Sequence, residues 1–250
     1  MDMRIIAHRG ASGYAPENTL EAFALAAELG AFAVELDVYL TADNRLAVHH
    51  DGNVSRMTNG QCGEFIEKLT MPELKSYRFC GNNADKYPDA MLPELSEVYD
   101  LMKLTGTVVN TELQSAPRDP ERRKLFIDLL LETASKCGMS GSVIYSAFNT
   151  DNLLALKAAD PDCSTALLYT YSEALGWTHG MTPWEYAKSL GCSALHPHYK
   201  RVTDRSFCDA CHALGLKVHP WTANTAGDIN DLLDKGCDAV ITNYPDILTK

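Results

Sequence analysis

The chain lacks any run of about eighteen consecutive apolar residues, the length a helix needs to cross a membrane, so no stable membrane insertion is expected. It also shows no secretory signal peptide, which would begin with a basic region and continue with a long apolar region. Met1–Arg4 is followed directly by the short apolar run Ile5–Ala7. A cytoplasmic protein is therefore expected. Positive charge is scarce: 22 Lys and Arg against 33 Asp and Glu give a net charge of −11. This balance argues against polyanionic partners such as nucleic acid or an anionic membrane surface.

A spaced cysteine framework is also missing. The 8 cysteines are scattered along the chain and are expected to be reduced thiols, several of them buried. Cys208, Cys211 and His212 spell the C-x-x-C-H pattern of haem attachment. However, Phe207, Cys208, Cys211 and Leu214 recur at helical spacing, so we predict the buried face of an ordinary helix there.

Two patterns alternate along the chain: short apolar runs typical of buried parallel strands, and longer segments with apolar residues at helical spacing. In a chain of 250 residues, eight such repeats predict a single-domain (β/α)8 TIM barrel over residues 1–250, with a doubly wound open sheet as the alternative. The expected strands are Arg4–His8, Ala33–Asp37, Thr107–Leu113, Ser142–Ala147, Thr165–Leu168, Cys192–His196, Lys217–Trp221 and Ala239–Thr242. The expected helices are Glu17–Leu29, Pro93–Leu104, Pro120–Lys136, Thr150–Ala159, Pro183–Leu190, Asp204–Leu214 and Ala226–Lys235.

Polar residues of catalytic types close three of the apolar runs. His8 ends the first run, Glu35 and Asp37 end the second, and His50 ends a further short run. In TIM barrels the carboxyl ends of the strands and the loops after them carry the chemistry. Glu35 and Asp37 alternate along a strand and so share one face, where two carboxylates repel each other unless a cation lies between them. An active site is favoured, and a polar rim without function is the plainer alternative.

The run Arg45–His50 is expected to form an added β-hairpin strand rather than a barrel strand. Asp43 and Asn44 both tolerate positive φ, so a two-residue turn is predicted there. That turn sets His50 opposite Asp37, and directly opposed residues share a face with Cβ atoms ~5 Å apart. Residues 52–92 then interrupt the alternation, and we expect a small insertion that caps the mouth of the site.

With these residues in view, the chain resembles the glycerophosphodiester phosphodiesterase family. The resemblance covers nearly the whole chain, and its motifs stand in the family's order. The combination is highly specific. The matching motifs are His8-Arg9-Gly10, Pro16-Glu17-Asn18-Thr19, Glu35-x-Asp37, His50-Asp51, Glu112, Ser146-Ala147-Phe148-Asn149, Trp221-Thr222-Ala223-Asn224, and the stretch from Gly236 to Pro245.

The resemblance implies an enzyme that hydrolyses glycerophosphodiesters to an alcohol and sn-glycerol 3-phosphate with a divalent cation. It makes His8 and His50 the catalytic acid and base, without assigning either role. It makes Glu35, Asp37 and Glu112 the metal ligands. Three carboxylates suit a hard cation, Mg²⁺ or Ca²⁺, rather than a thiolate-preferring metal.

Substrate contacts are expected from residues around the barrel mouth. The resemblance makes Arg9 the phosphate contact, and its planar donors match two phosphate oxygens. Gln114 stands where the family usually has Lys, which removes one positive donor. His198 and Trp221 are further candidates at strand ends, with ordinary packing as an equal alternative. Asn243 replaces the family's usual Asp and is expected not to touch the chemistry.

Two other functions stay open at this point. A related barrel phosphodiesterase, of the phospholipase or sphingomyelinase D kind, would act on a lipid diester. The missing export signal and the lack of an apolar membrane-binding patch argue against it. A non-catalytic phosphodiester-binding barrel would keep the fold without activity, and only Gln114 hints at it. The expected partner is therefore a small glycerophosphodiester, while the oligomeric state leaves no trace in the sequence.

Overall fold

The computed structural model describes residues 5–79, 81, 83–170, 178 and 180–248. Its strands are β1 (Ile5–His8), β2 (Ala33–Leu40), β3 (Leu46–Val48), β4 (Val108–Glu112), β5 (Val143–Ala147), β6 (Ser164–Tyr169), β7 (Ala194–Pro197), β8 (Lys217–Val218) and β9 (Val240–Thr242). Its α-helices are α1 (Leu20–Glu28), α2 (Met71–Lys75), α3 (Leu95–Thr105), α4 (Pro120–Lys136), α5 (Thr150–Ala159), α6 (Pro183–Ser189), α7 (Arg205–Ala213) and α8 (Ala226–Asp234). Short 3₁₀ turns are η1 (Ile66–Lys68), η2 (Ala84–Lys86), η3 (Ser140–Ser142) and η4 (Tyr199–Arg201).

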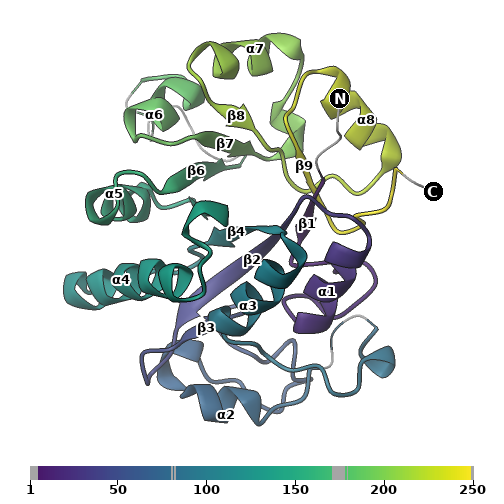
Figure 1. Cartoon of the computed structure of the whole chain (residues 1–250), viewed down its shortest axis with the longest axis vertical. Helices are drawn as coiled ribbons and strands as arrows, with labels where there is room; N and C mark the ends of the chain where they lie inside the picture. Colours follow the sequence, from purple (N-terminus) through teal and green to yellow (C-terminus); the bar gives the residue numbers. More distant parts are fainter. Residues whose placement is uncertain (1–4, 80, 82, 171–177, 179, 249–250) are drawn as a thin grey trace.

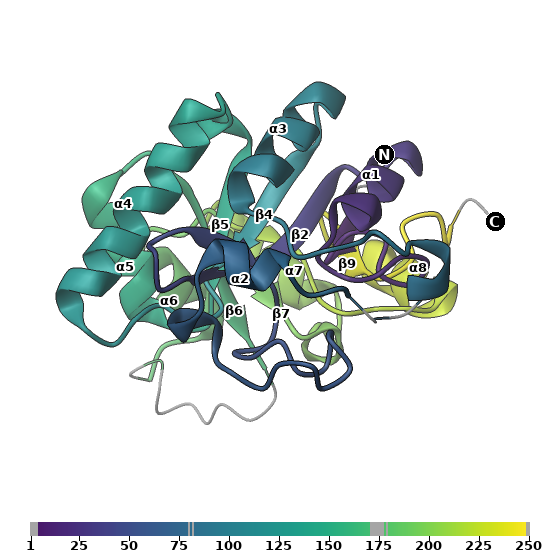
Figure 2. The ribbon, with the colours of Figure 1, turned by 90° about the horizontal axis from the view of Figure 1, so that it is seen from below.

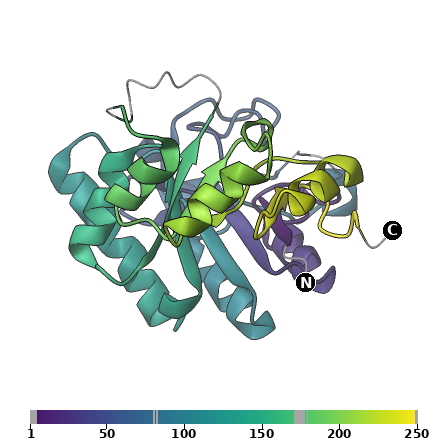
Figure 3. The ribbon, with the colours of Figure 1, turned by 90° about the horizontal axis from the view of Figure 1, so that it is seen from above.

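The parallel strands run in the order β8-β7-β6-β5-β4-β2-β1-β9, and β3 pairs only with β2. The N–H groups of Asp238 and Ile241 donate to the carbonyl oxygens of Val218 (3.0 Å) and Pro220 (2.9 Å), which joins the two ends of this order. The predicted TIM barrel is therefore confirmed. In the described part of the chain, α1 and α3 to α8 connect successive barrel strands and lie outside them (Figures 1 and 3).

Capping groups set the limits of the outer helices. Thr19 and Asp119 accept backbone N–H groups at the starts of α1 and α4, which satisfies donors that the helix leaves unpaired. Gly30 and Gly215 follow α1 and α7 with positive φ, as expected of residues that end a helix. Cys208 on α7 is fully buried, so the C-x-x-C-H pattern belongs to a core helix as predicted. All seven cysteines among the described residues are free.

The predicted hairpin register is wrong by one residue. Val38 pairs with Val48, and the N–H of His49, not of His50, donates to the carbonyl of Asp37. The turn has three residues rather than two, because the Thr41 N–H donates to the carbonyl of Arg45 (2.9 Å) and Asn44 alone takes a positive φ of 60°. Three-residue loops that end in a left-handed residue are a common hairpin form. The sequence could not separate the two because Asp43 and Asn44 suit either.

The described residues of the segment 52–92 contribute to a separate hydrophobic cluster. Figure 2 shows this segment, with α2, lying across one side of the barrel. The cluster also includes Ala47 of β3, so it packs on the hairpin and not inside the barrel. Its buried members are Ala47, Val54, Met57, Cys62, Ile66, Met71, Leu74, Phe79 and Leu92. Among the described residues, no helix has both the length and the apolarity needed to cross a membrane.

Candidate active site

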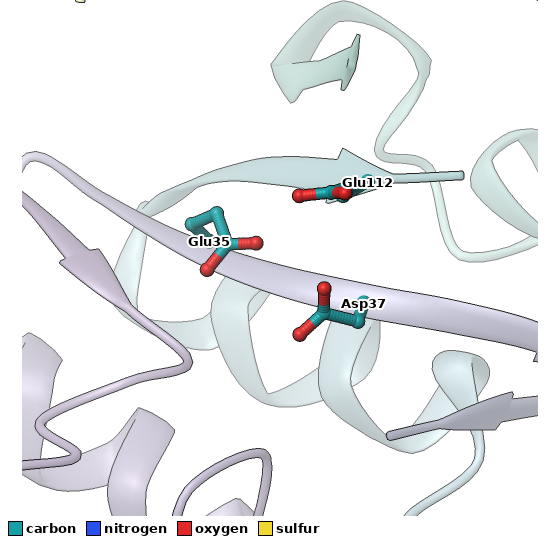
Figure 4. A group of neighbouring side chains, drawn as sticks. All are labelled: Glu35, Asp37 and Glu112. Atoms are coloured by element: carbon teal, nitrogen blue, oxygen red, sulfur yellow. The ribbon is translucent and has the colours of Figure 1, made fainter. Parts of the chain in front are cut away.

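Three carboxylates converge where β2 and β4 lie side by side. Glu35 and Asp37 are two residues apart on β2, and the parallel register sets Asp37 beside Glu112 of β4. Opposed residues of neighbouring strands point to the same face, so all three carboxylates face one space (Figure 4). One oxygen from each lies within 4.8 Å of the others. Glu35 and Asp37 are 3% and 1% exposed.

The electrostatics of this cluster call for a cation. Burial raises the pKa of Glu35 well above its ordinary value, and the charges of Asp37 and Glu112 raise it further. Burial and the charge of Asp37 also raise the pKa of Glu112. Burial likewise raises the pKa of Asp37, although Arg9 opposes the shift. A hard divalent ion would stabilise all three in their charged form, and carboxylate oxygens are the ligands it prefers.

Hydrogen bonds leave oxygens of the cluster available for such an ion. Oε2 of Glu35 accepts the backbone N–H of Arg9 at 2.9 Å, and Oδ2 of Asp37 accepts Nδ2 of Asn18 at 2.9 Å. Among the described residues no hydrogen bond is seen to Oε1 of Glu35 or to Oδ1 of Asp37. The residues present therefore fit a divalent cation.

A cavity of about 140 Å³ opens beside Glu35 and Glu112. Its other polar lining residues are His8, Arg9, His50, Asn110 and Gln114, and its apolar wall includes Phe148, Leu168 and Trp221. Of the substrate contacts predicted from the sequence, Arg9, Gln114 and Trp221 line this cavity. His198 does not line it and instead packs edge-to-face on Trp221, with ring centroids 5.5 Å apart, so its contact with substrate stays a prediction.

His8 is oriented by a residue that the sequence analysis had set aside. Its Nδ1 lies 2.7 Å from Oδ1 of Asn243, and its Nε2 lies 4.0 Å from Oε2 of Glu35. Burial, followed by the charge of Arg9, lowers the pKa of His8 to about 3. Nδ1 therefore carries the hydrogen that Asn243 accepts, and Nε2 keeps a lone pair. The sequence analysis set Asn243 apart from the site, but β9 pairs with β1 and brings the Asn243 amide to the imidazole of His8.

His50 and His49 point to different surroundings. His50 lines the cavity, and its Nδ1 lies 2.7 Å from Oδ1 of Asp51. His49 is buried beside Phe79, with ring centroids 5.7 Å apart. Despite the shifted register, His50 thus lines the same cavity as Glu35 and Glu112.

The loop after β1 positions Arg9. Arg9 and Gly10 both have positive φ, at 55° and 77°, and a Cβ on Gly10 would lie 2.6 Å from the backbone of Ala22. This turn aims the backbone N–H of Arg9 at Glu35 and sets its Nε 3.5 Å from Oδ2 of Asp37. The required glycine explains why the motif reads His-Arg-Gly.

Sequence reasoning missed Asn110, which lines the cavity and is 1% exposed. It pairs with Glu35 across the sheet, and neither atom of its amide has a partner among the described residues. Its position two residues before Glu112 was the available signal, since alternation puts both side chains on one face of β4.

The closed barrel, with carboxylates and imidazoles gathered at the carboxyl ends of its first strands, defines a TIM-barrel enzyme. The chain belongs to the glycerophosphoryl diester phosphodiesterase family, whose profile matches residues 8–247, and it is a phosphodiesterase of that family. The resemblance drawn from the motifs is confirmed.

Individual relatives agree over almost their full length. The glycerophosphodiester phosphodiesterase of Caldanaerobacter subterraneus subsp. tengcongensis is 32% identical over 99% of this chain and 97% of its own. The structure of an Oleispira antarctica phosphodiesterase in complex with the product sn-glycerol-3-phosphate has a TM-score of 0.84 and 29% identity, over 98% of this chain and 95% of that one. The glycerophosphodiester phosphodiesterase of Thermotoga maritima has a TM-score of 0.79 and 25% identity, over 100% and 98% of the two chains.

Proposed function

We propose that this enzyme hydrolyses glycerophosphodiesters to an alcohol and sn-glycerol 3-phosphate, using a divalent cation, Mg²⁺ or Ca²⁺, held by Glu35, Asp37 and Glu112. The observation that carries the proposal is one cavity lined by His8, His50, Glu35 and Glu112, with Asp37 completing the carboxylate cluster. The Oleispira antarctica relative, described with sn-glycerol-3-phosphate as its product, supports the product class.

The bound cation would supply Lewis-acid stabilisation of charge on a phosphoryl oxygen. The protein supplies the shape around it. Arg9 lies beside Asp37 and lines the cavity, so its guanidinium can donate to phosphate oxygens. Trp221 and Phe148 form an apolar wall, with ring centroids 5.6 Å apart, against which a glycerol or alcohol carbon chain can pack.

The two imidazoles divide the proton transfers. Nδ1 of His8 faces Asn243 and its Nε2 lone pair is unprotonated, so Nε2 is the atom to take a proton from the nucleophile. Nδ1 of His50 lies 2.7 Å from Oδ1 of Asp51, which orients the ring and leaves Nε2 as the atom to protonate the leaving alkoxide. Each transfer contributes about 10²- to 10⁴-fold to the rate.

Three features of the proposal come from the sequence alone. Residues 52–92 are proposed to cap the site and to contribute to the choice of leaving alcohol. Gln114, which lines the cavity, is proposed to contact substrate without the charge of a lysine. The cytoplasmic location stays a prediction.

The test is a coupled assay for glycerol 3-phosphate over a panel of deacylated diesters, with choline, ethanolamine, glycerol and inositol as leaving alcohols, and with lysophosphatidylcholine as the lipid arm. We expect release from at least one deacylated diester, loss of release with EDTA, and recovery with excess Mg²⁺ or Ca²⁺. Release of choline from the lysolipid alone would instead identify a lipid phosphodiesterase. Tight binding of diesters without turnover would identify a non-catalytic barrel.

A further inference from the structure

A continuous chain of charged contacts connects the two sides of the cavity. Nη1 of Arg9 donates to Oε1 of Glu17 at 2.8 Å. Arg56 donates to the same carboxylate through Nη2 (2.8 Å) and Nη1 (3.1 Å). Nε of Arg56 donates to Oδ2 of Asp51 at 2.7 Å, and the other oxygen of Asp51 lies 2.7 Å from Nδ1 of His50. Arg56 therefore stands at the middle of a chain whose ends are the cavity residues Arg9 and His50.

The members of this chain come from three separate segments. Glu17 belongs to the loop between β1 and α1, Asp51 follows β3, and Arg56 belongs to the insertion of residues 52–92. Arg56 does not line the cavity. It is connected to the cavity residues through the two carboxylates, which it contacts with all three guanidinium nitrogens. Lysine cannot reproduce this planar set of donors.

Both carboxylates are held in their charged form by these contacts. Burial works to raise the pKa of Glu17, but the Arg56 hydrogen bonds and the Arg9 charge lower it to about 2. Burial has the same opposing effect on Asp51, whose hydrogen bonds with Arg56 and His50 lower its pKa to about 2. Each carboxylate accepts from Arg56 on one side and contacts a cavity residue on the other.

We propose that Arg56 is a positioning residue for phosphodiester hydrolysis: through Asp51 it fixes the ring orientation of His50, and through Glu17 it fixes the guanidinium of Arg9. This inference rests on the proposed function. It makes the insertion part of the catalytic apparatus, because the insertion supplies a group, Arg56, that contacts both carboxylates. A merely structural Arg56 would anchor the insertion and leave the geometry of His50 unchanged.

The first experiment compares Arg56→Gln with the matched control Arg45→Gln. The Arg45 side chain is 43% exposed, against 49% for Arg56, and its guanidinium pairs with Glu94 and does not line the cavity. Half-exposed ion pairs add little to stability, so both variants are expected to fold. Arg56→Gln should lower kcat/KM about 10- to 100-fold through misplaced reacting groups, and Arg45→Gln should stay within about 2-fold. Equal values for the two variants would overturn the proposal.

The second experiment reads the geometry without substrate. Proton–nitrogen spectra of the histidine rings are recorded above about pH 8, where an ordinary imidazole is neutral, and the His50 signals are assigned by their loss in His50→Asn. The wild type should show the hydrogen on Nδ1, facing Asp51. Arg56→Gln should show mixed tautomers, and Arg45→Gln the wild-type pattern. An unchanged His50 pattern in Arg56→Gln would overturn the proposal even if the protein were less stable.

A third arm covers poor folding of Arg56→Gln. The single variants Glu17→Gln and Asp51→Asn then weaken each of the two connections separately: Arg56–Glu17–Arg9 and Arg56–Asp51–His50. Glu17→Gln should mainly raise KM, because it frees Arg9, and Asp51→Asn should mainly lower kcat, because it frees His50. If both variants changed KM and kcat in the same way, the proposal that Arg56 acts on Arg9 and His50 through separate carboxylates would be contradicted. If the wild type released no glycerol 3-phosphate, the proposed function would fail, while the ring spectra would still decide the role of Arg56.

Discussion

At the scale of single residues, the site depends on partners that select one ring nitrogen of each histidine. Nδ1 of His8 faces Asn243, and Nδ1 of His50 faces Asp51. In both rings the proposed mechanism uses Nε2. The partner of His8 is a neutral amide and the partner of His50 is a carboxylate.

Replacing either catalytic imidazole should abolish most activity without unfolding the barrel. His8→Ala and His50→Ala are each expected to lower kcat by about 10²- to 10⁴-fold, because each removes one proton transfer. The measurement is glycerol 3-phosphate release, with circular dichroism melting as the check on folding. His212→Ala is the control, since His212 pairs with Asp238 outside the cavity. Near wild-type rates in both His8→Ala and His50→Ala would refute the assignment.

The carboxylate cluster predicts opposite effects of one substitution with and without metal. Mg²⁺ should stabilise the wild type by about 2.7 kcal/mol at a hundred times its Kd, as for any ligand of the folded state. Glu35→Gln should lose this gain. In EDTA the same variant should melt no lower than the wild type, because a neutral glutamine avoids the burial cost and charge repulsion that raise the pKa of Glu35. Thermal melting with and without Mg²⁺ measures both, and an undiminished Mg²⁺ shift in Glu35→Gln would exclude Glu35 as a ligand.

The sequence located the cavity residues that stand at strand ends, but not the residues that orient them. His8, Glu35 and His50 follow from motifs and from strand alternation. Asn243 could not be placed beside His8, because that contact spans 235 positions and exists only once the barrel closes. Long-range contacts between loops leave no periodic signal in the chain.

At the scale of elements, the turn after β1 requires glycine at position 10 for two separate reasons. Gly10 needs a positive φ of 77°, and it also needs the space that a Cβ would take from the backbone of Ala22, 2.6 Å away. Gly30 after α1 has nearly the same φ, 79°, with nothing within 4 Å of a built Cβ. A side chain at position 30 would therefore meet only backbone strain, whereas one at position 10 would meet both backbone strain and a steric clash.

Alanine at these glycines should therefore have unequal costs. Gly30→Ala is expected to lose about 1 kcal/mol of unfolding free energy from its left-handed backbone alone. Gly10→Ala should lose distinctly more and should also lower activity, because the loop that carries Arg9 must move. Urea unfolding and the glycerol 3-phosphate assay measure the two effects. Equal losses of unfolding free energy for both variants would show that the backbone at Ala22 moves to accommodate the added Cβ at little cost.

Element boundaries could be predicted where a specific residue marks them, and could not be predicted where the local sequence is compatible with more than one turn. The strand and helix order follows from periodicity, and Gly30 and Gly215 mark helix ends as expected. The hairpin register failed because Asp43 and Asn44 are compatible with turns of two or three residues. The side chain of Thr41 decides between them by accepting the Arg45 N–H at 2.8 Å.

At the scale of the whole molecule, buried neutral histidines make stability depend on pH. Burial lowers the pKa of His49 to about 4 and lowers that of His196 well below its ordinary value. Between about pH 6.5 and pH 4 the unfolded chain binds protons at these rings and the folded chain does not, so unfolding becomes easier as the pH falls.

The contribution of His49 to this pH dependence of the unfolding free energy can be measured by comparing the wild type with a variant that lacks the ring. From about pH 7.5 to pH 5 the wild type should lose more unfolding free energy than His49→Gln, by up to about 1.4 kcal/mol for each pH unit below 6.5. The raised pKa values of the carboxylate cluster act in the opposite direction, but they are common to both proteins and cancel. Urea unfolding at both pH values measures the difference, and identical slopes would show that His49 is already charged in the folded state.

The bond between His8 and Asn243 also links catalysis to the order in which the chain is made. His8 ends the first strand, whereas its amide partner follows the last strand, β9. A growing chain on the ribosome therefore holds His8 without its amide partner until Asn243 has been made. Hydrolytic competence should require synthesis through Asn243, so a chain that terminates before that residue should be inert.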